Sequence, residues 1–95
     1  MATKKDDNKK ITLPAMNTKI KLLIPIEING ATVKEINMRR PTLGDQLNAD
    51  RACDSDRGKE IHIIASLTEI APEDLEKLDL ADYKKLQEQF QSFLS

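Results

Sequence analysis

Side chains able to carry out catalysis are few in this chain and lie far apart. His62 is the single histidine and Cys53 the single cysteine. Nucleophilic catalysis needs a serine or cysteine beside a base, and no serine stands in a nucleophile-elbow pattern. The three glycines are too widely spaced to form a phosphate-binding loop. We therefore expect no enzymatic activity and interpret His62 as a surface or packed side chain.

Three acidic residues, Asp54, Asp56 and Glu60, are the candidates for a cation site. They lack the glycine and the terminal glutamate spacing of an EF-hand loop. A polar turn is the better interpretation of this segment. We predict no metal site and no cofactor.

Two expected helices, 42–53 and 59–70, are joined by a short loop, as in a helix-turn-helix motif. The second reads KEIHIIASLTEI and lacks the arginine, asparagine and glutamine side chains that read base edges. Basic side chains lie instead near the N-terminus, in the strands and at Arg39 and Arg40. A small DNA-binding regulator stays an alternative, but we expect this chain to contact proteins rather than nucleic acid.

Composition limits the size of the fold and its surroundings. The chain has 95 residues, of which 39% are hydrophobic and 33% charged, and this fits one small domain. The N-terminus lacks the apolar stretch of a secretory signal, and no apolar run reaches the ~18 residues of a membrane span. One cysteine excludes an internal disulfide. We expect an intracellular protein.

An alternating apolar pattern predicts the element on which the others rest. The apolar residues at every second position are Ile20, Leu22, Ile24, Ile26 and Ile28. Such residues share one face of an extended strand. Asn29-Gly30 follows, and this pair best tolerates the positive φ angles of a type I′ turn. We predict an antiparallel hairpin over 19–39, preceded by a mobile polar arm over 1–18.

The second strand of this hairpin conflicts with a regular ladder. Its apolar residues Val33 and Ile36 have opposite parity, so they would face opposite sides of the sheet. One extra residue at 34–35 would bring both to the same face, beside Pro25, which has no N–H for the ladder. We predict a β-bulge at 34–35. The bulge would set Ile24 opposite Ile36 and Leu22 opposite Met38.

Capping signals and helical spacing predict helices over about 42–53, 59–70, 72–78 and 79–94. Thr42 with Asp45 forms a capping pair for the first helix, which should turn Leu43 and Leu47 inward. The second helix is apolar around most of its circumference and should be central. The last helix has one apolar arc, formed by Leu80, Tyr83, Leu86, Phe90, Phe93 and Leu94. We predict a single α+β domain over 19–95, with three to four helices packed on one face of the hairpin.

Two stretches, INGATVKEINMRRPTLGDQL and EIHIIASLTEIAPEDLEKLDLADYKKLQEQF, occur in an order that resembles a known family. They resemble the small tail assembly chaperones of contractile-tailed, Mu-like phages and prophages. The resemblance covers residues 20–94. Its most specific parts are the Arg-Arg-Pro-Thr run at 39–42, Asp45, the connection at 67–75 and the segment 78–83.

This resemblance implies a protein without enzymatic activity, made in the cytoplasm of the bacterial host and absent from the mature virion. Proteins of the family are thought to coat the tape measure protein, to keep it soluble and to help recruit tail tube subunits. The tape measure protein and the tail tube protein are therefore the expected partners, and self-association stays open. A minor structural tail protein is the remaining alternative.

A chaperone of helical segments needs an apolar groove with a charged rim. We predict this groove between the hairpin and the last helix, with Phe90, Phe93 and Leu94 at its edge. Phe93 and Leu94 have the alternative role of closing the core. The predicted partner-binding residues are Arg39, Arg40, Tyr83, Phe90, Phe93 and Leu94.

Overall fold

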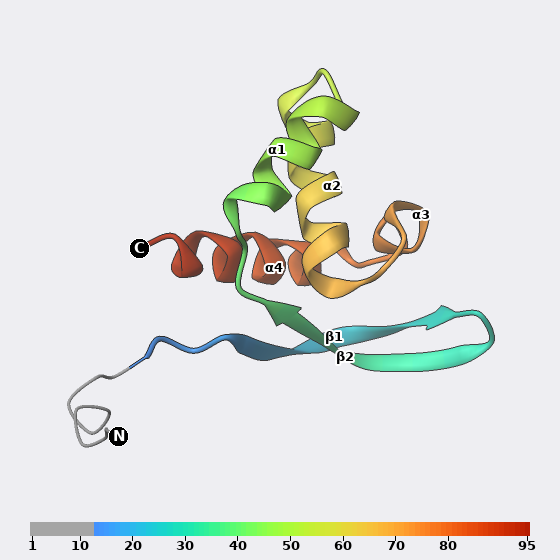
Figure 1. The fold of residues 1–95 in the computed structure, drawn as a ribbon. Helices are drawn as coiled ribbons and strands as arrows, with labels where there is room; N and C mark the ends of the chain where they lie inside the picture. The colour runs from blue at the N-terminus through green and yellow to red at the C-terminus, as the bar shows by residue number, and fades with distance from the viewer. Residues whose placement is uncertain (1–12) are drawn as a thin grey trace.

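The fold is an antiparallel hairpin with helices on one of its two faces (Figure 1). A computed structural model describes residues 13–95. Its elements are β1 (Asn17–Ile28), β2 (Ala31–Arg39), α1 (Leu43–Ala52), α2 (Asp56–Thr68), α3 (Pro72–Leu75) and α4 (Leu80–Phe93). The predicted α+β class is therefore confirmed. Most of the expected arm over 1–18 lies outside the described residues, and its last two positions already belong to β1.

A two-residue turn joins the strands where the sequence predicts it. Asn29 has φ +52° and Gly30 has φ +82°, and Ile28 lies opposite Ala31. Positive φ at both central residues matches the twist of a hairpin, and asparagine followed by glycine adopts it at the lowest steric cost. The turn prediction is confirmed.

The ladder between the strands is interrupted beside Pro25, but the extra residues lie in β1. The pairs that flank the interruption are Lys21–Glu35 and Ile26–Val33. Residues 22–25 of β1 therefore lie against a single residue of β2, Lys34. The predicted bulge at 34–35 is wrong in its strand and its size. Beyond the break, Ile36 lies opposite Ile20 rather than Ile24, and Met38 opposite Thr18 rather than Leu22.

The reason for this longer interruption is a carboxylate from outside the hairpin. The N–H groups of Leu23 and Ile24 donate to Asp82 of α4, at 2.8 and 3.0 Å, instead of to β2. Pro25 has no N–H to donate. Three successive residues of β1 thus give the ladder no donor, and Ile24, expected in the core, is 50% exposed.

The central helix is α2, as its apolar pattern predicts. It packs against α1, β2, α3 and α4, while α4 lies against β1. The apolar residues of both strands still face the helices, because observed and predicted registers differ by an even number of residues. The buried core comprises Ile20, Ile26, Ile36, Met38, Ala49, Ile63, Ile64, Ala65, Leu67, Leu75, Leu78, Tyr83, Leu86, Phe90 and Phe93.

Candidate partner-binding site

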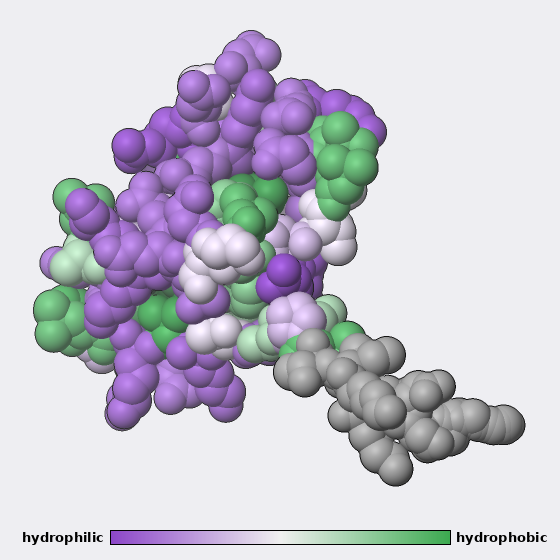
Figure 2. Space-filling view, turned by 90° about the vertical axis from the view of Figure 1, so that its left-hand side faces the viewer, coloured by the Kyte–Doolittle hydropathy of each residue, from purple (hydrophilic) through white to green (hydrophobic). Residues whose placement is uncertain are grey.

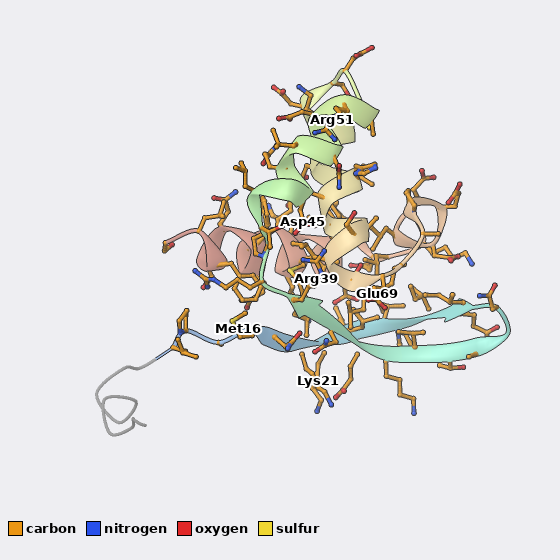
Figure 3. All side chains as sticks on the ribbon, in the orientation of Figure 1. Met16, Lys21, Arg39, Asp45, Arg51 and Glu69 are labelled. Atoms are coloured by element: carbon orange, nitrogen blue, oxygen red, sulfur yellow. The ribbon has the colours of Figure 1, made fainter. Side chains whose placement is uncertain are left out.

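A network around Asp45 fixes the start of α1 relative to the end of β2. The Thr42 hydroxyl accepts a hydrogen bond from the Asp45 N–H at 3.3 Å, and the Thr42 N–H donates to the Asp45 carboxylate at 2.8 Å. Arg39 donates to both carboxylate oxygens, each at 2.8 Å. Figure 3 shows Arg39 and Asp45 side by side where the hairpin meets α1. The predicted capping pair is therefore a complete capping box with an added ion pair.

These contacts shift the pKa values of the two charged groups. The hydrogen bonds from Arg39 lower the pKa of Asp45 to about 2, and those from Thr42 add to the effect, although burial opposes it. The same bond to Asp45 raises the pKa of Arg39. Both groups are therefore held in their charged forms.

A second network fixes α4 on β1. Asp82 is fully buried, and besides the two N–H groups of β1 its carboxylate meets the Lys85 ammonium at 3.2 Å. Burial raises the pKa of Asp82, but the N–H groups of Ile24 and Leu23 and the charge of Lys85 outweigh it, so this pKa is lowered. The carboxylate is therefore ionised in the interior and holds the first turn of α4 against the interrupted part of β1.

An apolar groove of about 220 Å³ lies where α1 begins and α4 ends. Its lining residues are Pro41, Thr42, Leu43, Gln46, Ile63, Phe90 and Leu94. Leu43 and Leu94 are 74% and 60% exposed, whereas Ile63 and Phe90 belong to the core. Figure 2 looks toward the end of the molecule where α4 finishes and shows hydrophobic side chains bordered by hydrophilic ones. The two exposed leucines therefore flank a depression whose base is core.

Residues 19–95 match the model of a family described as phage tail assembly chaperone proteins, E, or 41 or 14. This match spans most of the chain. The chain belongs to the phage tail assembly chaperone family. Searches of curated proteins and of solved structures gave no match. Within residues 13–95 of this tail assembly chaperone, no helix has the length and apolar character needed to cross a membrane.

The residues predicted to bind partners fall into two groups in the chaperone. Phe90 and Leu94 line the groove, which lies between α1 and α4 rather than between the hairpin and α4, because α4 packs directly on β1. Tyr83 and Phe93 are buried in the core, at 8% and 4% exposure. The Tyr83 hydroxyl donates to Glu60 at 2.9 Å, and its pKa is raised by burial and by this bond.

The two predicted arginines differ in their contacts. Arg39 is engaged with Asp45, and its side chain keeps 39% exposure. Arg40 lies with its guanidinium carbon 5.7 Å from the centre of the Phe93 ring, a cation–π distance. Arg40 directly precedes Pro41 of the groove, so its charge lies next to the groove while Arg39 serves the start of α1.

Leu43 is the groove residue that the sequence assigned to the core. It begins α1, and Leu47, one turn later, is also 42% exposed. The signal in the sequence is this i, i+4 pair of leucines on an otherwise polar helix. Such a pair marks either a core face or a binding face, and the spacing is the same in both cases.

The chemical candidates of the sequence stay apart in the chaperone. His62 is half-buried on α2, and its Nδ1 atom has no hydrogen-bond partner among the described residues. Cys53 is a half-buried thiol after α1. Within 13–95, no three histidine, cysteine or acidic side chains gather into a possible metal site. The groove is therefore the feature that we carry forward.

Proposed function

We propose that this tail assembly chaperone binds a helical segment of the tape measure protein in the groove between α1 and α4 and thereby keeps that protein soluble. The observation that carries the proposal is the pair of exposed leucines, Leu43 and Leu94, beside an apolar depression. Exposed apolar patches on small proteins mark sites of interaction. An amphipathic helix with its apolar face in such a depression is a common mode of recognition.

The dimensions of the groove suit a client that must later be released. A volume of about 220 Å³ accepts one or two apolar side chains and not a whole helix. Leu47 extends the apolar stripe along α1 for one further turn. Interfaces of this limited area are typical of transient complexes, as assembly requires when tube subunits replace the chaperone.

The charge next to the groove favours one kind of client segment. Arg40 precedes the groove residue Pro41 and keeps its charge over the Phe93 ring. An acidic side chain one turn from the apolar anchor of the client would lie near this guanidinium. We therefore expect the bound segments to carry large apolar residues flanked by glutamate or aspartate.

Co-expression with the tape measure protein tests the groove, with Leu43→Glu as the test variant and Leu80→Glu as its control. Both leucines begin a capped helix, and they are 74% and 70% exposed. A glutamate in the first turn favours either helix through the macrodipole, so both variants should fold. We expect Leu43→Glu to lower the soluble fraction of the client severalfold and Leu80→Glu to leave it unchanged.

The result that would overturn this site is full solubility of the client with Leu43→Glu, in a variant whose circular dichroism matches the parent. Equal losses with both variants would also contradict it, because Leu80 lies at the other end of α4 from the groove.

We further propose that the chaperone recruits tail tube subunits, acts in the host cytoplasm and does not remain in the mature virion. Family membership supports this part of the proposal. Mass spectrometry of purified particles is the direct measurement. Recovery of the chain in amounts stoichiometric with tail proteins would favour a minor structural role instead.

A further inference from the structure

The two outer edges of the hairpin differ in how their backbone groups are satisfied. Along β1, Lys85 donates to the Lys21 carbonyl at 3.0 Å, and Lys77 donates to the Glu27 carbonyl at 2.9 Å. Between these two points Asp82 accepts the two N–H groups of the interrupted segment. Side chains of α4 and of the turn before it therefore cover the edge of β1.

The outward groups of β2 follow from the ladder. Arg40 donates its N–H to the Met16 carbonyl, so the residues at even positions of this part of β2 face β1. The N–H and C=O groups of Glu35, Asn37 and Arg39 consequently point away from β1. Among residues 13–95, no hydrogen bond from outside the hairpin reaches these groups. The edge of β2 is thus open within the described part of the chain.

An open edge is a template for another strand, and proteins commonly block such edges with charges, proline or a covering element. We propose that the edge of β2 pairs with β2 of a second copy of this chain, antiparallel, with Asn37 opposite Asn37 on the two-fold axis. The two hairpins then form one four-stranded sheet. A sheet of this size is more stable than an isolated two-stranded hairpin.

Charge complementarity within β2 selects this register. With the axis at Asn37, Glu35 of each copy lies opposite Arg39 of the other, and Ile36 lies opposite Met38. An axis at Glu35 would set Glu35 opposite Glu35, and an axis at Arg39 would set Arg39 opposite Arg39. Directly opposed like charges destabilise a strand pair, whereas opposite charges stabilise it. Arg39 bonds Asp45 through its Nη atoms, and its Nε–H points along a different direction for a second acidic partner.

The two-fold axis of this pairing is perpendicular to the sheet. It therefore keeps the helical layers of both copies on the same side of the sheet. Each copy retains its own groove, since the residues of the groove come from α1, α2 and α4 and not from β2. The pairing of β2 edges is thus independent of the client site, and its test needs no client.

Proline substitutions at two facing positions make a matched test. Asn37 and Lys19 lie opposite each other, and both have outward N–H groups, one on each edge of the hairpin. Proline at an edge position with an outward N–H removes a donor for a neighbouring strand and no bond within the hairpin. In sedimentation experiments from the micromolar to the millimolar range, we expect dimers for the parent and for Lys19→Pro, and monomers for Asn37→Pro.

A charge reversal tests the register separately. Glu35→Arg places arginine opposite Arg39 at both ends of the pair, so the dissociation constant should rise severalfold in a variant of an exposed residue that retains the fold. Hydrogen exchange should show the amide of Asn37 protected in the parent at high concentration. A parent that stays monomeric throughout, or an Asn37→Pro variant that dimerises like the parent, would overturn the proposal; if Asn37→Pro does not fold, unchanged dimerisation of Glu35→Arg does the same.

Discussion

Asp45 in α1 and Asp82 in α4 occupy the same position, the third residue of a capped helix, but bind different parts of the molecule. Asp45 turns back to its own capping residue and to Arg39, only six positions away. Asp82 extends to β1 and accepts N–H groups 58 and 59 positions away. The same residue at the same helical position thus serves as a local cap in one helix and as a long-range contact in the other.

The burial of the partners accounts for this difference. Asp45 pairs with an arginine whose side chain is 39% exposed, so water can solvate that charge if the pair is lost. Asp82 is fully buried and lies against backbone donors that have no partner in the ladder. The role of an aspartate at this position is therefore set by what lies opposite it, and the strand interrupted beside Pro25 supplies donors only to Asp82.

The largest expected effect comes from Asp82→Asn. An amide has a single acceptor oxygen and would turn its NH₂ group toward a backbone N–H, leaving a buried donor unpaired. We expect the free energy of unfolding to fall by about 3 kcal/mol. Urea unfolding followed by circular dichroism measures it. The control is Asp79→Asn at the N-cap of the same helix, where asparagine caps about as well as aspartate.

Asp45→Asn should have a smaller effect. Asparagine can still accept the Thr42 N–H, and the exposed part of Arg39 regains water. We expect a loss of about 1 kcal/mol in the free energy of unfolding, by the same measurement. A loss as large as that of Asp82→Asn would contradict the distinction between a local cap and a buried long-range contact.

Features that depend on neighbouring residues were predictable from the sequence. The Asn29-Gly30 turn and the Thr42–Asp45 capping pair each need residues at most three positions apart. The size of the interruption in β1 was not predictable, because it depends on Asp82, which is 58 positions beyond Ile24. Pro25 indicated where the ladder breaks, but not how many residues leave it.

The groove could be predicted only in part for a similar reason. The apolar arc of α4 identified Phe90 and Leu94, but the arc is wider than the groove and also includes the buried Tyr83 and Phe93. Helical spacing shows which side of a helix is apolar and not which part of that side a neighbour covers. Leu43 was assigned to the core because its cover, unlike its spacing, depends on where α4 ends.

The smallest expected effect concerns pH and separates the two aspartates once more. The folded-state pKa of Asp45 is about 2, below its ordinary value of 3.8. A lowered pKa stabilises the fold above 3.8, and this contribution is lost as the pH falls to about 2. The pKa of Asp82 is lowered as well, so its contribution has the same sign. Asp45→Asn should therefore make the decline of the urea midpoint over this range shallower without removing it, because Asp82 still titrates. Asp50→Asn, which removes an exposed aspartate of the same helix, controls for net charge and should keep the steeper decline of the parent. Identical profiles for Asp45→Asn and the parent would show that the pair with Arg39 does not contribute to acid stability.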